Sequence, residues 1–217
     1  MWSYPTKYSD ECGTENTIIH NDGLTLSLIL RGVEFSGNDF DSLTPSQQTT
    51  KSQLTFFTLS QGALCACTIQ CQIPIPVMLR ELKSEGILDA EITLGRPSSN
   101  GGIDQEKLNL ILHYGNERIC SRGSNGWFED ELLDIQNQLP DGVYLKSCIN
   151  CLYSDYSPAG HGLFGGMMCF RNLKTEYLKV KSKVDFWQVH GRQDRFVQET
   201  YVSDEFERRV SGTGYRG

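Results

Sequence analysis

Residues 17–35 read TIIHNDGLTLSLILRGVEF, and this stretch carries the clearest strand pattern of the chain. Every second residue from Leu24 to Leu30 is leucine, which places the leucines on one face of an extended strand. Asn21-Asp22-Gly23 supplies residue types that tolerate the positive φ of a tight turn. We therefore predict a β-hairpin over residues 17–35.

Three further stretches have strand character, namely residues 53–72, 87–94 and 108–114. They are rich in Leu, Ile, Thr and Phe, and clusters of Pro, Ser, Gly and Asn separate them. No helical pattern alternates with them, which favours an antiparallel sheet or sandwich over a parallel sheet. The N-terminal half is therefore predicted to be predominantly antiparallel β.

A helix is predicted over residues 127–139. Phe128, Leu132 and Ile135 recur at roughly helical spacing, and acidic residues fill the first turn, where they complement the helix dipole. Pro140-Asp141-Gly142 then ends the helix with turn residues. The expected fold class is α+β, with this helix between the β-rich half and a small cysteine-rich C-terminal region.

The chain is expected to divide near Gly142 into a β-rich domain, residues 1–142, and a cysteine-rich metal-binding region, residues 143–217. Residues 143–149 are predicted to form a strand that places Cys148 at its end. Three more elements are expected beyond it: a helix over residues 170–182 and strands over residues 184–189 and 196–202.

The composition is that of an ordinary folded protein of 217 residues, with 38% hydrophobic and 22% charged residues. The first residues, MWSYPTKYSDECG, do not form a secretory signal, and no run approaches the roughly 20 apolar residues needed to span a bilayer. We therefore expect a cytoplasmic protein without a membrane partner. In that reducing compartment, the eight cysteines are not expected to pair as structural disulfides, and the closely spaced ones are expected to hold metal or do redox work.

The charge is unevenly distributed. The formal net charge is -7, and residues 171–217 contain ten Lys and Arg against seven Asp and Glu, which leaves ten against twenty for residues 1–170. Phosphate binding depends largely on Lys and Arg, so a nucleic-acid partner is not expected. An acidic body of this kind suits a basic protein partner.

The strongest chemical motif is Cys148-Ile-Asn-Cys151, followed after the seventeen residues from Leu152 to Met168 by Cys169. Two cysteines separated by two residues place both sulfurs on one side of a tight turn, where they can grip zinc at about 2.3 Å per bond. We predict a zinc site at Cys148, Cys151 and Cys169. An iron–sulfur cluster is the alternative, because cysteine thiolates ligate both.

A structural zinc site needs a fourth ligand. His161, in the glycine-rich loop before the third cysteine, is the predicted one. The other candidates left open are His190, a cysteine from the N-terminal region such as Cys65, Cys67 or Cys71, the segment around Ser203, or no protein ligand at all. Reduced, partly buried thiols without metal are the simplest alternative to any metal site.

The segment from Cys148 to Arg209 resembles a recurring bacterial cysteine module, in which a CxxC, an aromatic residue, a third Cys and a fourth Cys before an acidic-aromatic stretch occur in order. The matching residues here are Cys148, Cys151, Tyr153, Cys169 and Asp204-Glu205-Phe206-Glu207. Ser203 stands where the fourth Cys would fall, and serine is a poor zinc ligand.

A broader resemblance covers most of the chain. The stretch from Trp127 to the C-terminal Gly-Thr-Gly-Tyr-Arg-Gly, together with Asp22-Gly23 and Val33-Glu34-Phe35, resembles an uncharacterised bacterial protein family. That resemblance implies no established activity.

These observations predict a non-enzymatic, zinc-stabilised protein that acts through contacts with another protein, for example in bacterial immunity or regulation. The alternative is a metal-dependent or redox enzyme, or an iron–sulfur redox sensor, that uses an open coordination position at the cysteine cluster. No catalytic residue is predicted, and the oligomeric state stays open.

Overall fold

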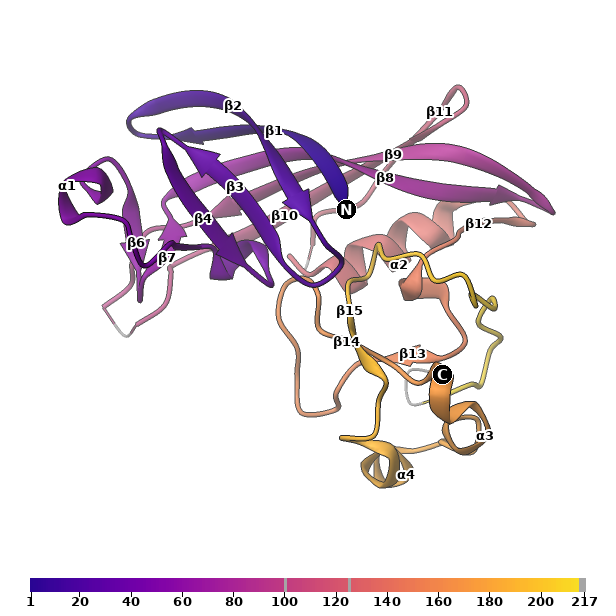
Figure 1. Cartoon of the computed structure of the whole chain (residues 1–217). Helices are drawn as coiled ribbons and strands as arrows, with labels where there is room; N and C mark the ends of the chain where they lie inside the picture. The colour runs from indigo at the N-terminus through magenta and orange to yellow at the C-terminus, as the bar shows by residue number, and fades with distance from the viewer. Residues whose placement is uncertain (100, 125, 215–217) are drawn as a thin grey trace.

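A computed structural model describes residues 1–99, 101–124 and 126–214 of the protein. The largest element is a ten-stranded antiparallel sheet (Figure 1). Its strands are β1 (Trp2–Asp10), β2 (Gly13–Asn21), β3 (Leu26–Leu30), β4 (Val33–Gly37), β5 (Thr44–Pro45), β8 (Cys67–Leu79), β9 (Leu82–Leu94), β10 (Glu106–Tyr114), β11 (Glu117–Cys120) and β12 (Val143–Leu145). They lie in the order β11-β10-β9-β8-β1-β2-β3-β4-β5, with β12 paired to β8 beside this path. The predicted predominance of antiparallel β structure is confirmed.

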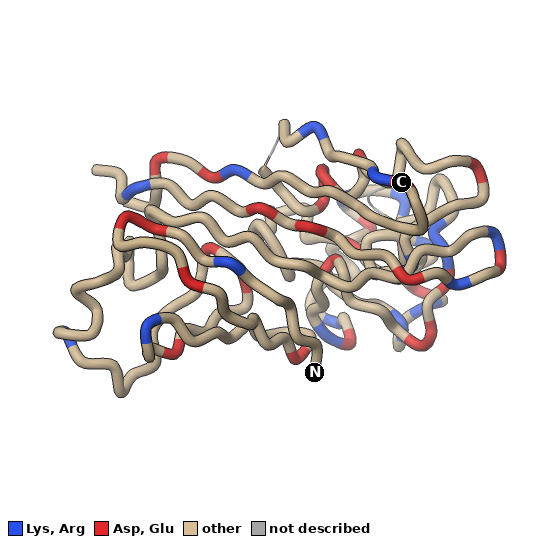
Figure 2. The backbone as a smooth tube through the Cα atoms, turned by 90° about the horizontal axis from the view of Figure 1, so that it is seen from above, with Lys and Arg blue, Asp and Glu red and all other residues tan. Residues whose placement is uncertain are grey.

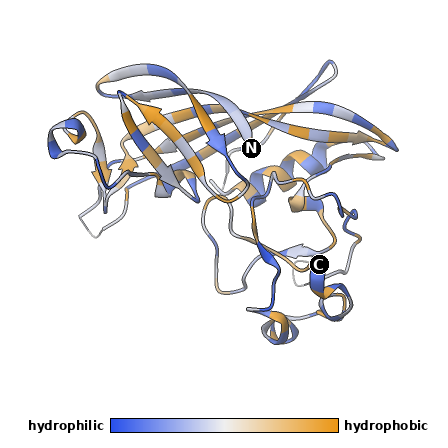
Figure 3. Cartoon of the chain, in the orientation of Figure 1, coloured by the Kyte–Doolittle hydropathy of each residue, from blue (hydrophilic) through white to orange (hydrophobic). Residues whose placement is uncertain are grey.

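The centre of the sheet is the hairpin of β8 and β9, which pair along all thirteen residues of each strand. Burial alternates along β8, so that Ile69 and Ile73 face the core while Gln70 and Gln72 face outward. This is the period of two expected of a sheet with one face buried and one face in solvent. Figure 3 shows the same alternation of hydrophobic and hydrophilic positions along the strands.

The predicted hairpin at residues 17–35 is part of a three-stranded meander of β2, β3 and β4. At its first turn, the Asp22 carboxylate accepts the backbone N–H groups of Leu24 and Thr25 at 2.9 and 2.7 Å. An aspartate side chain stabilises a tight turn in this way. At the second turn, Arg31 and Gly32 adopt positive φ values of 48° and 77°.

Residues 53–72 are less regular than predicted. They include the end of helix α1 (Lys51–Leu54), the short paired strands β6 (Thr58–Ser60) and β7 (Ala63–Cys65), and only the beginning of β8. Ala66, with a φ of 51°, separates β7 from β8. A single 3₁₀ turn, η1 (Phe40–Ser42), precedes this segment.

Helix α2 (Phe128–Gln138) lies below the sheet in Figure 1, against its inner face. Phe128, Leu132 and Ile135 are fully buried, and they belong to the same apolar core as the inner face of the sheet. The sequence predicts a helix over residues 127–139, which overlaps this element. Within the described residues, no helix is long and apolar enough to cross a membrane.

The remaining C-terminal region lies below the helix and the sheet (Figure 1). Its elements are η2 (Cys148–Asn150), β13 (Ser154–Asp155), β14 (Met167–Cys169), η3 (Arg171–Leu173), α3 (Lys174–Tyr177), α4 (Lys183–Val189) and β15 (Arg195–Val197). A second cluster of buried side chains stabilises it: Cys151, Tyr153, Met168, Phe170, Tyr177, Val180, Phe186 and Val189.

The strand predicted over residues 184–189 is wrong, because these residues form helix α4. The Ser182 side chain accepts the N–H of Asp185 at 3.2 Å and so caps the helix start. Phe186 and Val189, three residues apart, then face the second core together. The strand predicted over residues 196–202 is also shorter, because β15 ends at Val197.

The predicted division near Gly142 falls at a point of close contact. β12, directly after it, pairs with β8, and the main core contains Leu145, Cys148 and Cys169 together with the sheet residues. The two-part division therefore stays a prediction. The last three residues of the Gly-Thr-Gly-Tyr-Arg-Gly end, 215–217, lie outside the described residues.

Candidate functional site

The Cys148-Ile-Asn-Cys151 stretch forms one 3₁₀ turn, η2. The Cys151 N–H donates to the Cys148 carbonyl at 3.1 Å, so the two cysteines flank a single tight turn. Cys148 is 2% exposed and Cys151 is 4% exposed. The tight turn expected from the CxxC spacing is therefore present, with both thiols buried.

Cys169 reaches this turn through the short hairpin of β13 and β14, in which Ser154 pairs with Cys169. The Ser154 hydroxyl donates to the Cys148 carbonyl and lies 3.2 Å from the Cys151 carbonyl oxygen. Cys169 itself is 5% exposed. Cys148, Cys151 and Cys169 thus form one buried group, which we call the thiol cluster.

The segment after β15 runs along the other side of the CxxC turn. Cys148 donates its N–H to the Tyr201 carbonyl at 2.7 Å, and Leu152 donates to the Glu207 carbonyl at 2.7 Å. Ser203 lies between these two points of the segment and is buried. The residue at the position of the expected fourth cysteine therefore belongs to the segment that covers the thiol cluster.

Burial raises the pKa of Cys148 well above the ordinary value for a thiol, and the neighbouring Cys151 and Cys169 raise it further. Burial also raises the pKa of Cys169, although the backbone N–H of Arg171, which donates to this sulfur, lowers it. Both thiols are therefore protonated at neutral pH in the metal-free chain. Protonated, buried thiols are poor nucleophiles.

The structure does not show a metal site at the thiol cluster. Across residues 1–99, 101–124 and 126–214, no group of three or more His, Cys, Asp or Glu side chains is arranged to hold a metal ion. All eight cysteines are free. Zinc and the iron–sulfur alternative stay predictions.

His161 has other partners. Its Nε2 lies 3.0 Å from the Glu129 carboxylate and its Nδ1 lies 2.9 Å from the Gly162 carbonyl oxygen. Its ring stacks on Tyr156, with 4.0 Å between ring centroids. Burial lowers the pKa of His161, but the Glu129 carboxylate and the Gly162 carbonyl raise it more, so it lies above the ordinary histidine value. The predicted fourth ligand, His161, therefore contacts helix α2 through Glu129.

The other candidates for a fourth ligand are dispersed. His190 is exposed at the end of α4, where the centroid of its ring lies 4.9 Å from that of Trp187. Cys67 and Cys71 are buried in β8, and burial raises the pKa of each to about 12. Cys65 lies in β7.

Two buried carboxylates lie where Asp39, just before η1, contacts the C-terminal region, to which Glu199 itself belongs, and no sequence pattern points to them. Asp39 accepts two backbone N–H groups, one of them from Phe164 at 2.9 Å. Glu199 accepts the N–H of Gly165 at 2.7 Å and the hydroxyl of Tyr156 at 2.8 Å. Burial raises the pKa of Asp39 to about 8 and also raises that of Glu199. We call this pair the carboxylate joint.

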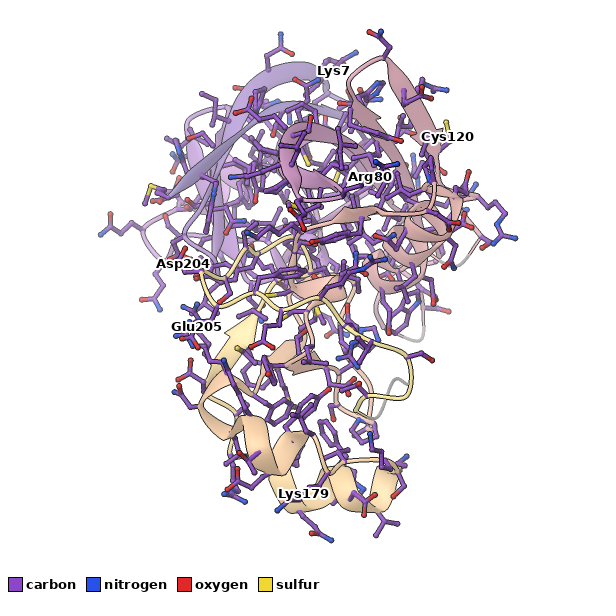
Figure 4. All side chains as sticks on the ribbon, turned by 90° about the vertical axis from the view of Figure 1, so that its right-hand side faces the viewer. Lys7, Arg80, Cys120, Lys179, Asp204 and Glu205 are labelled. Carbon is purple, nitrogen blue, oxygen red and sulfur yellow. The ribbon has the colours of Figure 1, made fainter. Side chains whose placement is uncertain are left out.

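The outer face of the sheet carries a hollow of about 790 Å³ that crosses from β2 to β11. We call it the outer hollow. Lys7 and Cys120, two of its lining residues, lie at the top of the sheet in Figure 4, whereas Lys179 marks the opposite end of the molecule. The outer hollow therefore faces away from the C-terminal region.

Two carboxylates lie at the centre of the outer hollow, on β9. Glu91 accepts the side-chain amides of Gln70 at 2.6 Å and Asn109 at 3.3 Å. Asp89 accepts the side-chain amide of Gln72 at 3.1 Å and lies 3.0 Å from Nε2 of His113. The alternation of β8, β9 and β10 places these side chains on one face, but their convergence depends on strand pairing that the sequence alone did not reveal.

Comparison with known proteins identifies a family, but one whose function is unknown. No curated protein and no solved structure matches the chain. One family model, described as a family of unknown function, DUF6304, matches residues 2–154. This range includes Cys148 and Cys151 and ends before His161, Cys169 and Ser203. Because the model covers more than half of the 217 residues, the chain belongs to the DUF6304 family of unknown function.

Proposed function

We propose that the protein is non-enzymatic and acts by binding a basic protein partner through the outer hollow. The observation that carries this proposal is the pair Asp89 and Glu91, held open to solvent by neighbouring side chains. Three of their four side-chain contacts are neutral amides, which orient the carboxylates without cancelling their charge. Such a pair can accept charge-assisted hydrogen bonds from Lys or Arg side chains.

The charge distribution supports the same partner. Residues 1–170, which include the whole sheet, contain twenty acidic and ten basic residues. Seen from above in Figure 2, acidic positions recur along the strands of the sheet. Complementary charge speeds association and selects partners more than it adds affinity. A regulatory or immunity protein that recognises a basic partner would use such a surface.

A peptide of lysine, arginine and glycine tests this proposal. Titrated into the protein and followed by amide NMR, it is expected to shift residues of β8, β9 and β10 on the outer face, and to bind more weakly as salt rises. The double variant Asp89→Asn, Glu91→Gln should lose this binding. The matched control is Glu81→Gln, Glu117→Gln, which removes the same charge from exposed positions outside the outer hollow. Equal loss in both double variants would contradict the proposal.

The second part of the proposal is that zinc stabilises the thiol cluster. The three buried cysteines lie on one tight turn and one adjoining hairpin, and a backbone N–H donates to the Cys169 sulfur. A thiolate bound to zinc would accept this hydrogen bond more strongly than a thiol, and such outer contacts are typical around metal ligands. Binding would require these side chains to close in around the ion, with a water molecule completing the set of ligands.

Elemental analysis of protein purified without oxygen tests the zinc. We expect one zinc per chain, lost in Cys151→Ser and retained in Cys12→Ser, whose thiol is exposed. Because metal binding can contribute on the order of 10 kcal/mol to folding, Cys151→Ser should also melt at a clearly lower temperature. Iron and a brown colour would identify the iron–sulfur alternative. Absence of any metal from the wild-type protein would contradict both.

A further inference from the structure

Helix α4 carries apolar side chains on two opposite sides. Phe186 and Val189 are buried in the second core. With 3.6 residues per turn, Val184 and Trp187 fall on the other side of the helix, where they are 72% and 46% exposed. A surface helix normally has polar residues on its outer side, and Trp is among the side chains that most often dominate the binding energy of a protein interface. The outer side of α4 therefore has the composition of a contact surface.

Basic side chains accompany this apolar pair. Residues 178–196 contain five Lys and Arg against two Asp. Lys183 lies four residues before Trp187, so the two side chains are neighbours on α4. Lys179, in the connection between α3 and α4, lies at the end of the molecule far from the top of the sheet (Figure 4). We call the exposed residues Lys179, Lys183, Val184, Trp187 and Arg192 the α4 surface.

The positive charge of the α4 surface is available to another molecule. The Asp185 carboxylate accepts the Lys181 N–H at 3.1 Å and the Ser182 hydroxyl at 2.8 Å. Asp194 lies 2.9 Å from the Arg171 guanidinium. Both acids are thus engaged within the region. In the part of the chain that the structure describes, by contrast, no ion pair involves the three bases of the α4 surface, Lys179, Lys183 and Arg192.

We propose that the α4 surface binds an acidic segment of another protein that carries apolar side chains between its carboxylates. Val184 and Trp187 contact the apolar side chains, and the bases around them pair with the carboxylates, as in an interface with an apolar centre and a polar rim. This surface goes beyond the proposed function, because it takes an acidic partner and, among the described residues, shares none with the outer hollow.

Two other anionic partners fit the α4 surface less well. The phosphate backbone of a nucleic acid matches the charge but offers no apolar side chain to Val184. An anionic membrane matches both features, but one pair of apolar side chains inserts less apolar surface than a single acyl chain, which by itself gives only marginal anchoring. The acidic residues 1–170 would also be repelled by such a membrane.

Two peptides test the partner. The first has three glutamates on either side of two leucines, and serines replace the leucines in the second. In NMR titrations of the full chain, with the Trp187 indole N–H as reporter, we expect the first peptide to bind about tenfold more tightly and both to weaken as salt rises. Equal affinities, or a Trp187 signal that does not move, would overturn the proposal. Tighter binding of oligouridine RNA or of phosphatidylglycerol vesicles at Trp187 would overturn it as well.

One apolar substitution locates the contact. Trp187→Ala removes an exposed side chain and leaves the second core intact, so the first peptide should bind about tenfold more weakly. The matched control is Leu82→Ala, at an exposed apolar position of β9, which should not change the affinity. Undiminished binding to Trp187→Ala contradicts the proposal.

A pair of charge reversals tests the bases. Lys179→Glu with Lys183→Glu should weaken both peptides and reduce the salt dependence. Lys83→Glu with Lys107→Glu makes the same change of charge at exposed positions of the sheet and should have little effect. Equal loss in both double variants would show a response to net charge alone and contradict the proposal. Binding of the basic peptide at the outer hollow is measured separately, so either proposal can fail without the other.

Discussion

The sheet and the C-terminal region are stabilised in different ways. The sheet depends on a repeated pattern, in which every second residue of β8, β9 and β10 is buried against one apolar core. The C-terminal region has strands of only two or three residues. Its segments are joined by individual polar contacts, such as the Tyr177 hydroxyl that donates to the buried Asp155 carboxylate at 2.9 Å.

This difference predicts where each region is sensitive. A patterned core tolerates the exchange of one apolar residue for another of similar volume. A buried polar contact does not tolerate the loss of one partner, because the other is left without compensation for its desolvation. The C-terminal region should therefore depend on a few residues, whereas the sheet should share its stability among many.

The largest effect is expected at Asp155, which is fully buried and also accepts the N–H of Tyr156 at 2.9 Å. Asp155→Ala should cost about 3–5 kcal/mol, because it breaks a buried charged network that includes Tyr177 and Arg209. In hydrogen exchange, β13, β14 and α3 should lose protection while β8 to β10 keep theirs. Equal loss of protection in both regions would show that they unfold as one unit.

In the sheet, the substitution to compare with Asp155→Ala is at Leu112. It is fully buried in β10, so Leu112→Ala should cost about 2–5 kcal/mol in urea unfolding. Leu112→Met conserves the volume and should cost less than about 1.5 kcal/mol. A cost for Leu112→Met as large as that for Leu112→Ala would contradict the distributed stability of the sheet.

Asp39 of the carboxylate joint, which accepts the N–H of Phe164 in the C-terminal region, should make the stability depend on pH. The pKa of Asp39 is about 8 in the folded chain against an ordinary 3.8, so the folded state holds a proton that the unfolded chain releases. The contribution of this proton to the free energy of unfolding is complete below the ordinary pKa of 3.8. It is lost as the pH rises through the folded-state pKa of about 8. Between these values, the free energy of unfolding should decline by about 1.4 kcal/mol per pH unit, measured from melting curves.

The control for this effect is Asp39→Asn, which has no proton to release. Its stability should change less steeply than that of the wild type over the same pH range. The raised pKa values of Glu199 and His161 act in the same direction, so some decline should remain. Identical pH profiles for the two proteins would exclude Asp39 as the titrating group.

The smallest effect is expected at the cap of α4. Ser182→Ala removes the side-chain acceptor for the Asp185 N–H and should cost about 1 kcal/mol. Because α4 has only seven residues, it should fray locally, and trypsin should cut faster at Lys183. Ser211→Ala, at an exposed position, is the matched control and should not change the cleavage rate.

The sequence predicted the sheet better than the C-terminal region, for a physical reason. Alternation such as that of Leu24 to Leu30 reports directly on which face of a strand is buried. The stretch that forms α4, Lys183-Val-Asp-Phe-Trp-Gln-Val189, contains β-branched and aromatic residues that favour strands. The cap at Ser182 and the packing of Phe186 into the second core stabilise this stretch as a helix instead.

The contacts of the candidate site were likewise predictable only where they are local in the sequence. Local spacing was enough to predict the tight turn between Cys148 and Cys151. It could not show that His161 meets Glu129 on α2, or that Asp39 meets Phe164, because these contacts join residues far apart in the chain. No periodic pattern marks such contacts, and they depend on how the loop before β14 folds back under the sheet.

Among the described residues, residues 72–75 of β8 pair with β9 alone, because β1 pairs with residues 67–71 and β12 with residues 77–79. Pro74 lies in this open stretch, and it affects how copies of this protein can meet. An unpaired strand edge normally offers a row of N–H and C=O groups on which a strand from another molecule can add, and this is a common start of aggregation. Pro74 interrupts that row, since it cannot donate. The β-rich chain can therefore keep an open position beside its longest hairpin without recruiting a neighbour's strand there.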